Sequence, residues 1–246
     1  MPEIYHIATG SAQPCDQAIA EVGNVLSSGG LALIPTETVY GLAVAVAPLA
    51  LVRTAEGAPG EPSVNGAALP PASSGYRRIF SVKQRDLTQT VPWLVGGVED
   101  LDRYGCAVDE VTRALADAFW PGALTLIVRA NDRVPRFMQA ADGTVALRCS
   151  ASPVVAALIN ACGCPLATTS ANTHGMPAPA AWAAVEQRVL EGVDAAIDAG
   201  ETPCQDASTI VSCVSGKIVV ARHGALSEDD IQRVAKTARM RMQDRQ

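Results

Sequence analysis

The chain has 246 residues, of which 48% are hydrophobic and only 4% aromatic, and its net charge at pH 7 is −6. This length and composition suit one domain with an aliphatic core, so we expect a single domain over residues 1–246. The acidic balance excludes a surface that coats nucleic acid generally, although a local basic patch stays compatible with it. No apolar run approaches the roughly 20 residues of a membrane span. No secretory signal opens the chain either, so we expect a cytoplasmic protein without a membrane partner.

Seven cysteines are present, and no Cys-x-x-Cys pair occurs among them. An odd number of cysteines without a secretory signal is typical of reduced thiols in a cytosolic protein, and we expect most of them to be buried. Cys162 and Cys164 lack a matching Cys or His pair at finger spacing, so we expect no metal site.

The first fifty residues alternate between strand and helix patterns. Residues 4–7 predict a strand, Asp16 is expected to cap a helix that ends at residues 29–30, and residues 31–34 and 42–46 predict two further strands. Between the two strands predicted at residues 31–34 and 42–46, the chain carries two hydroxyls, a carboxylate and a phenol directly after a buried strand. Open α/β sheets build ligand sites at such strand ends, although the same residues also suit an ordinary strand-to-loop junction.

A change of composition follows at residues 55–75. This stretch is rich in glycine and proline and has almost no large apolar side chain. It is typical of a flexible insertion within a domain rather than a linker, because strand-like sequence resumes afterwards. A lid over a binding site is the alternative, since long loops in compact domains are often functional.

Beyond residue 75 the chain returns to regular patterns. Residues 76–85 carry four cations around an apolar centre, which predicts a short helix with Lys83 and Arg85 at its end. Further strands are predicted over residues 91–95, 124–128, 144–148, 166–169, 195–198, 209–213 and 217–221. Further helices are predicted over residues 98–104, 110–119, 153–161, 181–190 and 228–245. This alternation from end to end predicts the α/β fold class.

The sequence lacks the motifs of several common enzyme classes. It contains no P-loop, no Gly-x-Gly-x-x-Gly fingerprint after a strand and no Gly-x-Ser-x-Gly elbow. What remains is a set of hydroxyls and cations at predicted strand ends. This set suits anion binding and a transfer at phosphorus, where positioning and charge neutralisation do most of the catalysis. Its members are Thr36, Thr38, Lys83, Arg85, Thr144, Arg148, Ser170, Ser208 and Arg222.

Residues 35–42, Pro-Thr-Glu-Thr-Val-Tyr-Gly-Leu, resemble the signature of the YrdC-like threonylcarbamoyl-AMP synthases. Further segments of that family occur in the same order, and the resemblance covers most of the chain. These segments are Ile79-Phe80 before Lys83-x-Arg85, Trp120-Pro121-Gly122-Ala123-Leu124-Thr125-Leu126, Thr144-Val145-Ala146-Leu147-Arg148, Ser170-Ala171-Asn172, Ser208-Thr209-Ile210-Val211 and Arg222-x-Gly224-Ala225.

The resemblance implies a YrdC-like fold, in which helices pack around a twisted open sheet of mixed strands with a deep central cavity. It implies an L-threonylcarbamoyladenylate synthase, a nucleotidyltransferase that makes threonylcarbamoyl-AMP and pyrophosphate from L-threonine, bicarbonate and ATP. The product serves the threonylcarbamoyladenosine modification of tRNA, so downstream tRNA-modification proteins are implied partners. ATP enters as a substrate, with Mg²⁺ carried mainly by the nucleotide.

Matching positions imply roles for single residues. The L-threonine ligands implied are Thr38, Arg148, Thr168 and Ser208. The ATP ligands implied are Arg85, Gln89, Thr144, Ser170 and Arg222. Lys83 and Arg85 are implied as catalytic residues beside the phosphates, and Thr36, Tyr40 and Asn172 as the pocket wall. Arg148 is expected to clamp the carboxylate of the amino acid bidentately.

The chain departs from the family pattern along one wall of the implied cavity. Leu94 stands where a histidine usually contacts threonine, Gln89 replaces an asparagine, Asp86 a proline and His174 a serine. Leucine has no hydrogen-bonding group. Leu94 and Asp86 motivate a second hypothesis beside the synthase, a relative without this catalysis that binds a nucleotide or RNA, such as tRNA or double-stranded RNA. A carbamoyl-transfer relative that uses another acceptor is a third interpretation.

Overall fold

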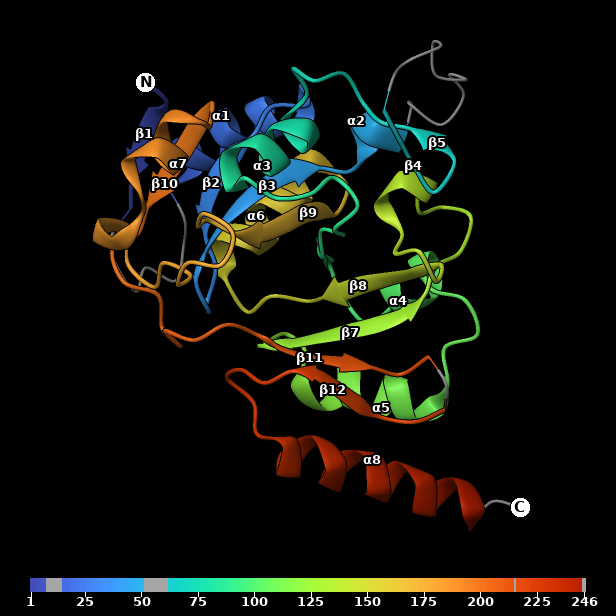
Figure 1. The fold of residues 1–246 in the computed structure, drawn as a ribbon. Helices are drawn as coiled ribbons and strands as arrows, with labels where there is room; N and C mark the ends of the chain where they lie inside the picture. The colour runs from blue at the N-terminus through green and yellow to red at the C-terminus, as the bar shows by residue number, and fades with distance from the viewer. Residues whose placement is uncertain (8–14, 51–61, 215, 245–246) are drawn as a thin grey trace.

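The computed structural model describes residues 1–7, 15–50, 62–214 and 216–244 (Figure 1). The strands of its main sheet are β1 Glu3–His6, β2 Ala32–Pro35, β3 Tyr40–Ala45, β6 Trp93–Leu94, β7 Leu124–Arg129, β8 Thr144–Arg148, β9 Leu166–Ser170, β10 Ala195–Asp198, β11 Thr209–Ser212 and β12 Val219–Arg222. The helices are α1 Asp16–Ser27, α2 Ala47–Ala50, α3 Gly75–Lys83, α4 Asp100–Tyr104, α5 Glu110–Phe119, α6 Pro153–Cys162, α7 Gln187–Glu191 and α8 Glu228–Gln243. Among the described residues, no helix has both the length and the apolar character that a bilayer crossing needs.

The ten strands follow the order β1-β10-β2-β3-β9-β6-β8-β7-β11-β12. Parallel and antiparallel neighbours are mixed, since β2 pairs antiparallel with β3 while β6 pairs parallel with β8. The predicted α/β class with mixed strands is confirmed. In this strand order, β3, β9, β8, β7 and β11 lie near one another in the middle of the sheet. Polar residues of these strands can therefore contribute to one site.

Helices cover the central strands because these strands are apolar on both faces. Every residue of β2 and β3 is buried, and continuous apolar runs are typical of strands covered on both sides. Helices α1 and α6 pack against each other and against β2, and Val22, Leu26 and Leu158 belong to the same buried apolar cluster as Ile34. At the other end of the sheet, α5 packs on β7, and α8 lies against α5 beyond β12 (Figure 1).

A hairpin occupies part of the stretch for which we expected no regular structure. Residues 51–61 lie outside the described part of the chain, but β4 Ser63–Val64 and β5 Ala67–Ala68 pair antiparallel, so that expectation is wrong for residues 63–68. Asn65 and Gly66 both have positive φ, as a two-residue hairpin turn requires. The Asn65 amide donates to the carbonyls of Arg136 and Gln139 at 3.2 and 2.8 Å, which fixes the hairpin to the rest of the fold.

Two helix predictions need correction. Residues 181–190 do not form one helix, because a 3₁₀ turn, η3 Trp182–Ala184, precedes α7 and the backbone between them is extended. The carboxylate of Glu186 accepts from the N–H and hydroxyl of Thr173 at 2.8 and 2.7 Å, which holds that break in place. Asp16 is not a cap either, since Cys15 takes the N-cap position without a side-chain bond.

The cysteines are less buried than we expected. Cys149 and Cys213 are buried, Cys162 and Cys164 are half-buried, and three others, Cys15, Cys106 and Cys204, are exposed. The expectation that most thiols are buried is therefore wrong.

The cap of α5 is the local interaction whose contribution to stability is simplest to measure. Asp109 accepts from the Thr112 N–H at 2.7 Å and from its hydroxyl at 2.6 Å. We expect Asp109→Ala to lower the free energy of unfolding by about 1 kcal/mol. Asp117→Ala, at an exposed position near the end of the same helix, is the matched control and should change it little. Urea unfolding measures both variants, and equal losses in the two would contradict the capping role.

Candidate active site

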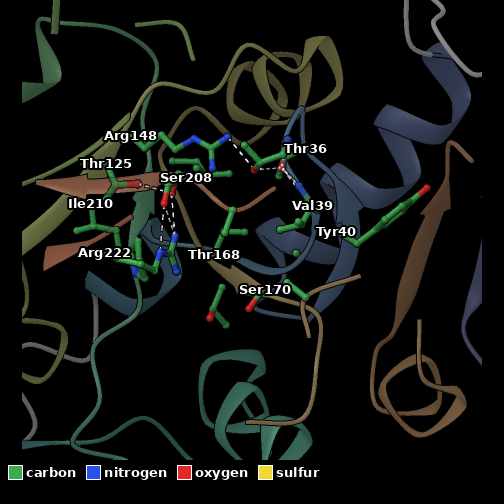
Figure 2. A pocket seen from close by; sticks show the side chains of 17 residues that line it. Thr36, Val39, Tyr40, Thr125, Arg148, Thr168, Ser170, Ser208, Ile210 and Arg222 are labelled. Atoms are coloured by element: carbon green, nitrogen blue, oxygen red, sulfur yellow. Dashed lines mark hydrogen bonds between the residues drawn. The ribbon is translucent and has the colours of Figure 1, made fainter. Parts of the chain in front are cut away.

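One pocket collects the polar strand ends at the middle of the sheet (Figure 2). It encloses about 660 Å³, counting its open mouth. The predicted site residues that line it are Thr36, Thr38, Tyr40, Arg148, Thr168, Ser170, Ser208 and Arg222. Residues far apart in the sequence therefore converge on one hollow, as a shared binding site requires.

The turn before β3 places the first hydroxyls. The Thr36 hydroxyl donates to the Val39 carbonyl at 2.7 Å and accepts from the N–H groups of Thr38 and Val39, both at 3.1 Å. Such a closed turn fixes the backbone, as serine and threonine often do in loops. Thr36 thus shapes the turn, and the hydroxyl of the fully buried Thr38 faces Arg148 at 3.0 Å.

Arg148 is held by three scaffold contacts at the end of β8. Its Nε donates to the Gly122 carbonyl at 3.0 Å, and its Nη2 donates to Glu37 at 2.6 Å and to Thr38 at 3.0 Å. Its Nη1 has no hydrogen-bond partner among the described residues. One nitrogen with two N–H groups is therefore available to an anion, and the expected bidentate clamp through two guanidinium nitrogens is not available in this arrangement.

Glu37 is the buried counter-charge behind the pocket. Besides Arg148, its carboxylate accepts from the Ser150 hydroxyl. Burial pushes the pKa of Glu37 upward, but Arg148 and Ser150 outweigh burial and hold that pKa below its usual value. Glu37 therefore stays ionised and orients Arg148 without lining the pocket itself.

Acid should weaken this ion pair. Because the folded-state pKa of Glu37 is lowered, the pair stabilises the fold above the unfolded-state pKa of about 4.3 and loses this contribution as pH falls through the folded-state pKa. We expect the difference in unfolding free energy between wild type and Glu37→Gln to be constant between about pH 7 and 5 and to shrink below about pH 4. Urea unfolding across this range measures it, and a difference that does not change with pH would contradict the role of Glu37.

On the opposite wall, Arg222 and Ser208 form a second polar group (Figure 2). Arg222 donates through Nε and Nη2 to the Ser208 carbonyl at 3.1 and 2.8 Å, and through Nη2 to its hydroxyl at 3.1 Å. The Ser208 hydroxyl also lies 2.9 Å from that of Thr125 on β7. Burial and the neighbouring Arg148 lower the pKa of Arg222. Two guanidinium groups near each other make the pocket attractive to an anion.

The Tyr40 phenol points away from the centre of the pocket (Figure 2). Its hydroxyl donates to the Gly200 carbonyl at 3.0 Å and accepts from the Ala199 N–H at 2.9 Å, and burial raises its pKa to about 12. Tyr40 is therefore a structural wall and not an acid or base. Next to it, a Cβ on Gly41 would lie 2.7 Å from the Thr168 methyl group, so only glycine allows this approach.

Lys83 and Arg85, expected to be catalytic, do not line the pocket. Lys83 is buried, and its ammonium group contacts the segment after β9. Arg85 donates to the Thr169 hydroxyl at 3.3 Å and to the carbonyls of Gln89 and Thr90 at 3.0 and 2.6 Å. Its Nε is buried without a partner in the described structure. Both cations thus contact residues of β9 or of the segment after it, and neither lines the pocket.

Three further predicted site residues also lie outside the lining. Gln89 is exposed, and it is its carbonyl that contacts Arg85. Thr144 stands at the other end of β8 from Arg148, about 13 Å away by strand rise, and its hydroxyl donates to Asp142 at 2.7 Å. Asn172 uses its amide to clamp its own loop, with bonds to the carbonyls of Thr173 and Met176 at 2.9 and 2.6 Å. None of the three reaches the pocket in this arrangement.

Sequence reasoning missed some members of the site. Glu37 and Thr125 stand inside matched motifs, but their roles depend on contacts with Arg148 and Ser208 that no spacing predicts. Leu94 does line the pocket, beside Arg148 in the register of β6 and β8. Among the described residues, no group of three or more His, Cys, Asp or Glu is placed to hold a metal ion.

The comparisons with known proteins agree with this architecture. The model of the Sua5/YciO/YrdC family, described as telomere recombination, matches residues 59–224. The threonylcarbamoyl-AMP synthase of Pyrococcus abyssi (strain GE5 / Orsay) is 29% identical over 209 residues, which are 85% of this chain and 54% of that protein. The putative threonylcarbamoyl-AMP synthase of Mycobacterium tuberculosis (strain ATCC 25618 / H37Rv) is 30% identical over 218 residues, which are 89% of each chain.

A solved structure is similar as well. The crystal structure of P. abyssi Sua5 complexed with L-threonine superposes with a TM-score of 0.77 at 26% identity, covering 94% of this chain and 60% of that one. The chain thus spans between half and two thirds of the length of its P. abyssi relatives.

A mixed ten-stranded sheet whose central strands contribute two arginines and several hydroxyls to one pocket places the chain in the class of α/β proteins with a polar central pocket. Within that class, the chain belongs to the Sua5/YciO/YrdC family.

Proposed function

We propose that the chain is an L-threonylcarbamoyladenylate synthase, a nucleotidyltransferase that uses L-threonine, bicarbonate and ATP. The observation that carries the proposal is that two guanidinium groups, Arg148 and Arg222, line one pocket together with several hydroxyls. A small amino acid and a nucleotide each bring an anionic group, and two separate cations suit two such ligands. The relatives named threonylcarbamoyl-AMP synthase support the choice of reaction.

The amino acid occupies the inner half of the pocket in this proposal. Its carboxylate accepts from Nη1 of Arg148, while the hydroxyls of Thr38, Thr168 and Ser208 bind its other polar groups. The buried Glu37 keeps Arg148 in place before the ligand arrives. A preorganised charge of this kind loses little energy to rearrangement when it binds. The P. abyssi structure with L-threonine supports threonine as this ligand.

The nucleotide occupies the outer half, against Ser170 and Arg222. The threonine nitrogen first attacks the carbon of bicarbonate, and a carbamate forms with release of water. A carbamate oxygen then attacks the α-phosphorus of ATP. The bond from the α-phosphorus to the bridging oxygen breaks, and pyrophosphate leaves with that oxygen. Arg222, together with Mg²⁺ carried by the nucleotide, offsets the triphosphate charge, and positioning supplies most of the rate. No carboxylate lines this pocket among the described residues, so the phosphates themselves carry the Mg²⁺.

A pyrophosphate-release assay with each substrate omitted in turn tests the proposal. We expect release only when L-threonine, bicarbonate and ATP are all present, and threonylcarbamoyl-AMP as the co-product. Release without threonine would indicate another acceptor. No turnover, with RNA binding that weakens steeply with salt as phosphate contacts require, would favour the RNA-binding alternative that Leu94 in the pocket suggests. Transfer of the product to tRNA with downstream tRNA-modification proteins is the last step of the proposal.

A further inference from the structure

The ammonium group of Lys83 is surrounded by oxygens of a single short segment. Its Nζ lies 2.5 Å from the Ser170 carbonyl, 2.9 Å from the Asn172 carbonyl and 3.1 Å from the Asn172 side-chain oxygen. The Ser170 hydroxyl is 3.4 Å away. An ammonium group has three N–H donors, so the three nearest oxygens already satisfy it. Lys83 is 3% exposed and does not line the pocket.

No carboxylate lies within ion-pair distance of Lys83 in the described part of the chain. Burial, and then the neighbouring Arg85, lower the pKa of Lys83 to about 8. A buried cation kept for stability alone is normally paired with an anion. Glu186, too far away for an ion pair, favours the charged form of Lys83 from a distance. The direct contacts of the buried ammonium group are therefore all with oxygens of the segment after β9.

The segment that Lys83 holds forms part of the pocket wall. Ser170 ends β9 and lines the pocket, and the loop after it returns to α3. In that loop the His174 N–H donates to the Lys83 carbonyl at 2.8 Å, so the lysine contacts the loop from both its side chain and its backbone. Arg188 adds a bond of 2.7 Å to the Val82 carbonyl just before it. The end of α3 and residues 170–176 are thus one connected unit.

We propose that Lys83 is a positioning residue, whose ammonium group fixes the carboxyl end of β9 so that Ser170 faces the nucleotide, and that it does not contact the phosphates. This assignment replaces the catalytic role that the motif implied. Removing the ammonium group would leave two backbone carbonyls and the Asn172 amide oxygen without their donor, which loosens the wall.

Hydrogen exchange of the ligand-free protein provides the first test. In Lys83→Met, whose side chain has similar length but no donor, we expect amides of residues 171–176 to exchange about tenfold faster, because local opening becomes easier. Amides within α5 should keep their rates. Lys236→Met, at an exposed lysine on α8, is the matched control. Unchanged exchange in residues 171–176 of Lys83→Met overturns the proposal.

Nucleotide binding provides the second test, and this arm alone rests on the proposed function. Calorimetry compares ATP with AMP, which lacks the two outer phosphates. A positioning role predicts that Lys83→Met weakens the binding of ATP and of AMP by the same factor. It also predicts that the factor by which KM for ATP rises exceeds the factor by which kcat falls. If Lys83 instead binds the phosphates, the loss of affinity for ATP should be at least about tenfold larger than the loss for AMP. That result overturns the proposal.

The two arms separate failure of the inference from failure of the proposed function. If wild type binds neither nucleotide, the proposed function fails and the exchange arm still decides the role of Lys83. If Lys83→Met does not fold, Lys83→Arg takes its place. The guanidinium of this variant keeps donors for the same carbonyls, so we expect the amides of residues 171–176 to be partly protected from hydrogen exchange. Protection equal to that of the wild type, together with a selective loss of ATP binding, overturns the proposal.

Discussion

Replacing Arg148 with methionine should abolish threonine-dependent pyrophosphate release and also destabilise the fold. The variant removes the guanidinium whose Nη1 binds the threonine carboxylate in the proposed complex, so kcat/KM for threonine should fall by at least about 100-fold. It also leaves the Glu37 carboxylate buried beside Ser150 without its counter-charge. Breaking a buried ion pair from one side costs about 3–5 kcal/mol of unfolding free energy. Steady-state kinetics and urea unfolding measure the two effects.

A double variant separates these two effects. Arg148→Met combined with Glu37→Gln removes the stranded charge, so we expect much of the lost stability to return while turnover stays absent. Replacing both partners of a buried pair is often close to neutral for stability. Recovery of threonine-dependent turnover in the double variant would contradict the role of Arg148 as the carboxylate ligand. The single variant Glu37→Gln should retain the guanidinium but orient it less well.

Arg222→Met should reduce turnover by acting on the nucleotide rather than on the amino acid. Arg222 is partly exposed, lines the pocket and has no ion-pair partner among the described residues, so its loss strands no charge. We expect kcat/KM for ATP to fall about 100-fold, as for loss of a cation that binds phosphate oxygens. Threonine affinity should fall by a smaller factor, because Arg222 also bonds the Ser208 hydroxyl. Calorimetry with each ligand, together with steady-state kinetics, measures this.

The control for Arg222 is an arginine of similar exposure outside the pocket. Arg129, at the exposed end of β7, is a suitable control, because Arg129→Met removes the same charge from the molecule at a position that does not line the pocket. Equal losses in both variants would indicate a long-range effect of net charge. A loss confined to threonine binding would place the nucleotide elsewhere.

The sequence predicted most elements because their signals are local. The Pro-Thr-Glu-Thr turn, the Pro153 start of α6 and the Ser227 cap of α8 all act within a few residues of themselves, and the structure shows each of them. The α/β class followed from the alternation of such elements. Predictions were wrong where a contact between residues far apart in the sequence determines the local structure. The bond from Thr173 to Glu186, for example, interrupts the helix expected at residues 181–190.

The hairpin at residues 63–68 is a failure of a different kind. Its Asn65-Gly66 turn is the strongest short-range signal for a hairpin, but the glycine- and proline-rich composition around it favoured a loop. The turn is fixed by the Asn65 amide, which donates to two carbonyls near residue 136. In this stretch, local turn chemistry outweighs average composition.

The site shows the same division between local and distant information. Motifs identified the hydroxyls and arginines that converge, because most of them stand at or next to a strand end in the central sheet. They did not distinguish residues that face the pocket from residues behind its wall. Thr144 and Arg148 share one motif but lie at opposite ends of β8, and Lys83 faces carbonyls instead of the pocket. Which side of a wall a residue occupies depends on register, which the sequence alone leaves open.

A crystal structure with L-threonine and a non-hydrolysable ATP analogue tests the central claim most directly. The account predicts one occupied pocket, with the amino-acid carboxylate against Nη1 of Arg148 and the nucleotide phosphates against Arg222. Ligands bound elsewhere on the molecule, or a pocket that stays empty at saturating ligand, would contradict it.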